Sequence, residues 1–182
     1  MDKERDIETT GAFYGQLFNS SKYVLLVMLF ASVIELFALP TMEGSYAMFI
    51  LLALTLLKIG FIIALSFNQL MKIIGQSHLL SHVLVLFGYL IVLIVFSFAI
   101  DYTALQFVDA IHFKMNNSIG KDGLSVFFDL SYFSLITFSS VGYGDIVPIS
   151  LPAKILVALE VALRFFVLVF GIANVNRIRV NK

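Results

Sequence analysis

One short run in this 182-residue chain has residue types and a spacing suited to chemistry: Ser-Ser-Val-Gly-Tyr-Gly-Asp, at positions 139–145. Gly142 and Gly144 accept positive φ at little cost, and their alternation with other residues can turn successive carbonyl oxygens to one side. Stacked rings of such oxygens replace the water shell of a cation. The run is therefore suited to a cation site built from backbone, although such a run on its own is more often a turn between helices. The elements around it decide between the two interpretations.

The composition places these elements in a membrane. Hydrophobic residues make up 60% of the chain and charged residues only 13%, whereas soluble domains carry about a quarter charged residues. The net charge of zero gives no sign of a nucleic-acid partner. The chain has no cysteine and only three scattered histidines, so a metal cofactor has little support. No nucleophile is paired with a base, and we do not expect an enzyme.

Four apolar stretches are long enough to cross a bilayer, which takes about 20 residues. They predict an all-α integral membrane protein with spans at 22–39, 46–67, 80–100 and 152–174. The first two are close enough in sequence to form a transmembrane hairpin, residues 22–67.

The other segments complete the expected organisation. Residues 1–21 form a cytoplasmic N-terminal segment, residues 68–79 an amphipathic linker at the interface, and residues 175–182 a short cytoplasmic tail. The last two spans and the run between them make up one module, residues 80–178.

Basic residues predict the orientation of the chain, because cytoplasmic segments carry an excess of Lys and Arg. With the N-terminus inside, seven basic residues lie in cytoplasmic segments and three in outer segments. The seven are Lys3, Arg5, Lys22, Lys72, Arg177, Arg179 and Lys182, and the three are Lys114, Lys121 and Lys154. We therefore expect both termini in the cytoplasm, in a plasma or inner membrane and in contact with its lipid.

The link between the last two spans contains a second apolar helix, predicted at 125–138, which is too short to cross the bilayer. An extended return follows it. Non-helical backbone at membrane depth is tolerated only where it is buried in protein or lines water. The pattern thus predicts a re-entrant helix and loop beside a water-lined path.

The stretch LSYFSLITFSSVGYGDIVP resembles the pore helix and selectivity filter of tetrameric potassium channels. These channels are the standard example of a filter whose backbone carbonyls replace the water around an ion. The likeness covers roughly residues 80–178 and is greatest to small prokaryotic channels with two extra preceding helices. It implies a homotetramer around a central pore, with the filter at residues 140–144. Bound K⁺ is then the expected ligand of Ser140, Val141, Gly142 and Tyr143, with Gly144 completing the filter.

The resemblance also assigns residues that support the filter. Asp145 matches an aspartate behind the filter, and Tyr132 an aromatic residue that bonds it, which predicts a Tyr132–Asp145 hydrogen bond. Thr137 and Ser139 are the hydroxyl residues that precede the filter. Ser140 stands where the family usually has threonine, and serine keeps the oxygen while it lacks the methyl group.

The last span resembles the inner helix that lines the cavity of such channels. By this resemblance the cavity and gate residues are Phe165, Leu168, Ile172 and Asn176, with Gly171 as a flexible point; ordinary packing or lipid contact is the alternative for these side chains. Arg164 falls where the family usually has a glycine. Because Glu160 lies four residues before Arg164, in the favourable order, we expect these two to pair behind the pore; the alternative is a closed or modulated pore.

Two further charges lie within the first two spans, Glu35 and Lys58. A voltage sensor needs several arginines on one helix, so this route to gating is not expected. Lys58 is expected in a buried ion pair, either with Glu35 or with Glu160, because both are within reach of a long side chain; a gating or ligand sensor is the alternative.

These observations favour a potassium-selective channel through which K⁺ passes passively. Two alternatives remain open: a non-conducting scaffold or sensor with a pore-like fold, which Arg164 favours, and a weakly selective cation channel, which the two serines favour.

Overall fold

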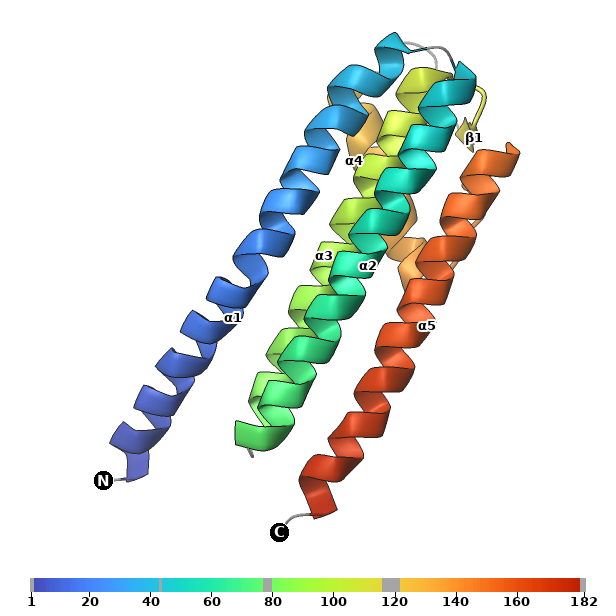
Figure 1. The fold of residues 1–182 in the computed structure, drawn as a ribbon. Coiled ribbons are helices and arrows are strands. Elements are labelled where there is room, and N and C mark those ends of the chain that lie inside the picture. Colours follow the sequence, from blue (N-terminus) through green and yellow to red (C-terminus); the bar gives the residue numbers. More distant parts are fainter. Residues whose placement is uncertain (1, 43, 77–79, 116–121, 181–182) are drawn as a thin grey trace.

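The structure is a computed structural model that describes residues 2–42, 44–76, 80–115 and 122–180. Within these residues, four long helices run side by side, and a shorter helix and a small sheet lie against them (Figure 1). The long helices are α1 (Asp2–Val33), α2 (Gly44–Gln76), α3 (Leu80–Val108) and α5 (Leu151–Val180), the shorter helix is α4 (Gly123–Phe138), and the strands are β1 (Phe113–Met115) and β2 (Ile146–Pro148). The two termini lie at the same end of the bundle (Figure 1).

Helix α1 does not stop at Val33 but changes its winding. A π-helical turn, Ile34–Ala38, and a 3-10 turn, Leu39–Thr41, lead into the loop before α2. Pro40 accounts for this ending, because proline has no N–H to donate and its ring clashes with the carbonyl four residues earlier. The wide turn contains Glu35, which is fully buried.

Helix α3 is the centre of the bundle. It contacts α1, α2, α4 and α5, and every residue from Ser97 to Gln106 is buried. A helix that is buried all round must satisfy its polar side chains inside the protein. The polar groups of this stretch therefore require partners on the neighbouring helices.

By length and composition, three helices of the described part are apolar enough to cross a membrane: Ser21–Thr41, Tyr46–Asn68 and Leu84–Val108. They correspond to the first three predicted spans. Their outer faces carry exposed large apolar side chains such as Phe30, Phe37 and Phe49, as expected for contact with lipid. Helix α5 is not among these three, and its described part carries Lys154, Glu160 and Arg164.

Several helices extend beyond their predicted bounds. Helix α2 continues to Gln76, through most of the predicted linker at 68–79, and α5 continues to Val180. Helix α3 passes the predicted end near Asp101 and reaches Val108. The predicted end was wrong there because Asp101 is completely buried rather than hydrated at the membrane surface.

A two-stranded antiparallel sheet joins the segment after α3 to the segment after the 139–145 run. Strands β1 and β2 pair with Lys114 opposite Val147 and Met115 opposite Ile146. The all-α prediction did not include this sheet. Because Ile146 directly follows Asp145, the pairing fixes the end of the run beside β1, the strand that follows α3.

Candidate functional site

The predicted filter begins where α4 ends, in a closed turn. The N–H of Val141 bonds to the carbonyl oxygen of Ile136 at 2.9 Å, and the N–H of Ser140 bonds to that of Thr137 at 3.1 Å. This pair of bonds is the Schellman ending of a helix, in which the residue after the cap takes a left-handed conformation. Ser140 occupies that position, with φ of 60°.

Positive φ recurs at every second residue of the run. Ser140, Gly142 and Gly144 have φ of 60°, 56° and 79°, whereas Val141 and Tyr143 are not among the residues with positive φ. This alternation is the backbone geometry that the sequence suggested for the two glycines. Serine is also easier to place at φ of 60° than the threonine usual in the family, because β-branched residues there are outliers.

The run lies on the surface of the single chain. Val141 is 49% exposed and Tyr143 72% exposed, although both are large side chains. A Cβ atom added to Gly142 or Gly144 would meet nothing within 4 Å. Within one chain, these glycines are therefore required by backbone conformation and not by a close neighbour.

The residues predicted to support the filter differ in the groups that they contact. The structure places the hydroxyl of Tyr132 close enough to the carboxylate of Asp145 for the two groups to interact, and the hydrogen bond between them stays a prediction. The Ser139 hydroxyl instead donates to the carbonyl oxygen of Leu135, at 2.8 Å, and so remains on its own helix. Thr137 is half-buried, and its carbonyl takes part in the closing turn.

Glu160 connects three helices behind the run. Its carboxylate accepts a hydrogen bond from Ser134 of α4 at 2.6 Å and another from Tyr102 of α3. Ser134 also bonds the carbonyl oxygen of Val95, at 3.0 Å. Because Glu160 is fully buried, these hydroxyl groups take the place of water around the carboxylate and tie α5 to α4 and α3.

Arg164 has a partner that the sequence did not suggest. Its Nη1 atom donates to the carbonyl oxygen of Phe138, the last residue of α4, at 3.2 Å. The guanidinium also lies over the ring of Phe165, 4.3 Å from the ring centre. The predicted Glu160–Arg164 pair was wrong: no ion pair joins them among the described residues, because nearby hydroxyls occupy the carboxylate.

The predicted cavity residues are only partly described. Phe165 and Leu168 are both exposed on α5 in the single chain, at 54% and 38%. Gly171, Ile172 and Asn176 lie on α5, but their side chains fall outside the described residues.

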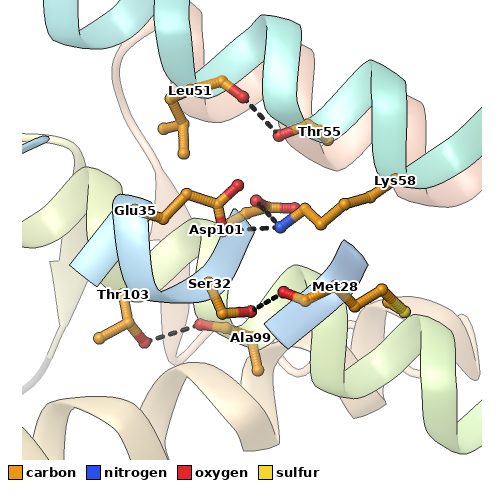
Figure 2. Close-up of polar contacts among 9 residues, drawn as sticks. All are labelled: Met28, Ser32, Glu35, Leu51, Thr55, Lys58, Ala99, Asp101 and Thr103. Atoms are coloured by element: carbon orange, nitrogen blue, oxygen red, sulfur yellow. Dashed lines mark hydrogen bonds and ion pairs between the residues drawn. The ribbon is translucent and has the colours of Figure 1, made fainter. Parts of the chain in front are cut away.

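Three buried charges meet among the first three helices (Figure 2). Nζ of Lys58 lies 2.7 Å from Oε2 of Glu35 and 2.6 Å from Oδ1 of Asp101. Glu35 is thus one of the two partners predicted for Lys58, and Glu160, the other, is not a partner. The prediction missed Asp101, whose signal was a carboxylate at the end of an apolar stretch.

The hydroxyl groups near these charges do not bond to them. Thr55, Ser32 and Thr103 each donate to a carbonyl four residues earlier on their own helix (Figure 2), as such residues commonly do in helices. Two carboxylates therefore face a single ammonium. One oxygen of each, Oε1 of Glu35 and Oδ2 of Asp101, is buried and has no hydrogen-bond partner within the described part of the chain.

A comparison with protein families places this geometry in context. A family model described as ion channel matches residues 88–180, which is 93 of the 182 residues. The match spans most of α3, the sheet, α4, the run at 139–145 and α5. Neither the curated proteins nor the solved structures gave a match.

Proposed function

Since the chain belongs to the ion channel family, we propose that it is a potassium-selective channel that conducts K⁺ passively. Four copies surround one axis, and each contributes the carbonyl oxygens near Ser140, Val141, Gly142 and Tyr143. These oxygens replace the water around K⁺.

One observation carries this proposal. Positive φ alternates through Ser140, Gly142 and Gly144, directly after a helix of 16 residues that ends in a closed turn. A surface turn between two helices has no need for this alternation. A filter needs it, because successive carbonyls have to face the same axis.

The membrane arrangement follows from the lengths of the helices. Helix α4 has 16 residues, or about 24 Å, and cannot cross a hydrocarbon core of about 30 Å. It is therefore the re-entrant pore helix. Helix α5 has 30 residues, or about 45 Å, and serves as the fourth span.

The charges of α5 are compatible with this role. Glu160 and Arg164 are both buried and bonded to α4, so they are not presented to lipid. The termini share one end of the bundle (Figure 1), and the basic residues place that end in the cytoplasm.

The exposed run supports assembly into a ring. Tyr143 is 72% exposed in the single chain, and one strand cannot surround an ion. Closed cyclic symmetry is the usual way for identical chains to complete a site. Four copies are proposed by resemblance to tetrameric potassium channels.

Recording from purified protein in liposomes with opposed K⁺ and Na⁺ gradients tests this proposal. A reversal potential near that of K⁺ is expected. A reversal near zero would favour the weakly selective cation channel. The absence of current from an intact tetramer would favour the non-conducting scaffold.

Two glycine variants make the test specific to the filter. Gly142→Ala is expected to abolish selective current, because alanine is strained at φ of 56°. Gly60→Ala is the matched control, since its added Cβ atom also meets nothing within 4 Å, but Gly60 lies in the ordinary helix α2. Equal loss of current in both variants would contradict the assignment of the filter.

A further inference from the structure

Arg164 completes the hydrogen bonding at the end of the pore helix α4. The last four carbonyls of a helix have no partners within it. Here the carbonyls of Leu135, Ile136 and Thr137 receive backbone N–H groups from Ser139, Val141 and Ser140, and that of Phe138 receives the guanidinium of Arg164. The final donor is therefore a full positive charge brought from another helix.

The charge of Arg164 is only partly offset by a carboxylate. No ion pair to Arg164 is found among the described residues. Glu160, one turn away on α5, is held by Ser134 and Tyr102 and acts on Arg164 through space, without an ion pair. The ring of Phe165 holds the guanidinium at 4.3 Å, which fixes its position without neutralising it.

The consequence is a weaker negative charge at the inner side of the filter. A helix C-terminus carries about −0.5 elementary charge, which favours a cation. An arginine at 3.2 Å from the last carbonyl opposes this partial charge, and the buried carboxylate of Glu160 offsets part of the arginine's effect. In a ring of four copies, the same opposition acts once in each copy, next to residues 139–140.

We propose that Arg164 is a conductance-determining residue that lowers the K⁺ occupancy of the ion path at the inner end of the filter. This inference rests on the proposed function and extends it. Permeating K⁺ therefore meets a weaker attraction there than the pore helices alone would supply. Current through the channel is limited by entry from the cytoplasmic side at low salt, where the charge of Arg164 is least screened.

Two substitutions separate charge from structure. Arg164→Gln keeps an N–H donor for the carbonyl of Phe138 but removes the charge, and Arg164→Lys keeps the charge. In about 10 mM KCl, where the screening length is about 30 Å, the glutamine variant is expected to conduct severalfold more than the wild type. In about 1 M KCl, where it is about 3 Å, the two are expected to converge, and the lysine variant should resemble the wild type throughout.

The wild type alone gives a second measurement, in case the glutamine variant does not assemble. Its conductance is expected to rise in proportion to KCl concentration across the low-salt range, because the inner end of the filter is rarely occupied there. A conductance that saturates from the lowest concentrations would overturn the proposal. So would a glutamine variant that matches the wild type at low salt, or a salt-independent difference, which marks a purely structural role.

Failure of this proposal is distinguishable from failure of the proposed function. A selective K⁺ current that is indifferent to Arg164 overturns the role of Arg164 alone. The absence of K⁺ current from the wild type and from both variants, when all three form tetramers, overturns the proposed function and the role of Arg164 with it.

Discussion

Two buried polar clusters in this protein satisfy their carboxylates in different ways. The hairpin cluster consists of Glu35, Lys58 and Asp101, and the pore cluster of Tyr102, Ser134 and Glu160. In the hairpin cluster, one ammonium serves two carboxylates. In the pore cluster, two neutral hydroxyl groups serve one carboxylate.

The two clusters meet on α3, in consecutive residues. Asp101 and Tyr102 project about 100° apart around the helix axis, because an α-helix has 3.6 residues per turn. Asp101 therefore contacts Lys58 of α2, and Tyr102 contacts Glu160 of α5. Helix α3 links the first two helices to the pore module through two separate polar contacts one residue apart.

This difference predicts how the stability of each region responds to the loss of a partner. Removing one member of a buried ion pair leaves an uncompensated charge, which is strongly destabilising. Removing one hydroxyl from a carboxylate that keeps another donor has a milder effect. The hairpin cluster should therefore be the more fragile of the two.

The largest effect is expected for Lys58→Met. This change leaves the carboxylates of Glu35 and Asp101 without their shared cation in a fully buried site. A loss of about 3–5 kcal/mol in the free energy of unfolding is expected. Thermal unfolding and the yield of intact protein in detergent would measure it.

The control for this prediction is a charge-free cluster. Lys58→Met combined with Glu35→Gln and Asp101→Asn is expected to recover most of the lost stability, because no unpaired charge remains. Thr55→Ala, one turn away on α2 and bonded only to Leu51 in the described contacts, should have a small effect. A triple variant as unstable as Lys58→Met would show that packing, and not charge, explains the loss.

A smaller effect is expected in the pore cluster. Tyr102→Phe removes one of the two hydroxyl donors of Glu160 and should cost about 1–3 kcal/mol. The same change should couple to Glu160→Gln in a double-mutant cycle, because the two side chains are in contact. Its coupling to Lys58→Met should be weaker, because only Asp101 of the other cluster acts on Tyr102 and Glu160, and it does so through space.

This cycle tests whether the clusters are separate. Strong coupling between Tyr102→Phe and Lys58→Met, equal to that with Glu160→Gln, would mean that the six residues act as one network. The hairpin cluster and the pore cluster would then lose stability as one unit when either loses a partner.

The parts of the fold that local sequence determines were predicted well. Apolar stretches of spanning length gave the first three spans, and the match of the ion channel family model agrees with the family inferred from the filter motif. The helix before the run ends at Phe138, as predicted, because the turn that closes it depends on adjacent residues. The alternating φ values likewise follow from the glycines at 142 and 144.

The partners of the buried charges could not be read from the sequence. Spacing of four residues favoured a Glu160–Arg164 pair, but donors from other helices occupy Glu160. The partner of Arg164 is a backbone carbonyl, which no residue pattern marks. A lone carboxylate after an apolar stretch is typical of the end of a span, so Asp101 was predicted to end one. It is buried instead because it pairs with Lys58, 43 positions earlier in the sequence.

The smallest expected effect lies between β1 and the start of α5, where an imidazole takes part in a hydrogen bond. Nδ1 of His112 lies 2.7 Å from the hydroxyl of Ser150, which also accepts the N–H of Ala153 in the first turn of α5. Burial lowers the pKa of His112 below its usual value, and nearby Asp109 only partly offsets this. The folded protein thus holds the uncharged form.

The sign of the pH dependence follows from this lowered pKa. Above about pH 6.5, His112 is neutral in both the folded and the unfolded chain, and its contribution to stability is complete. As the pH falls below that value and through the lowered pKa, the unfolded chain binds the proton more readily, so stability decreases.

Thermal unfolding between pH 8 and pH 5 would measure this effect, with His112→Gln as the uncharged comparison. The wild type should lose stability on acidification by a margin that His112→Gln removes. Combining His112→Gln with Lys58→Met would extend the test to the hairpin cluster. The pH dependence assigned to His112 should be the same in the Lys58→Met background, because the two sites share no partner among the described contacts. If the stability of the wild type and of His112→Gln fell equally on acidification, the titrating group would be another residue. The neutral histidine would then not distinguish the pore region from the hairpin cluster.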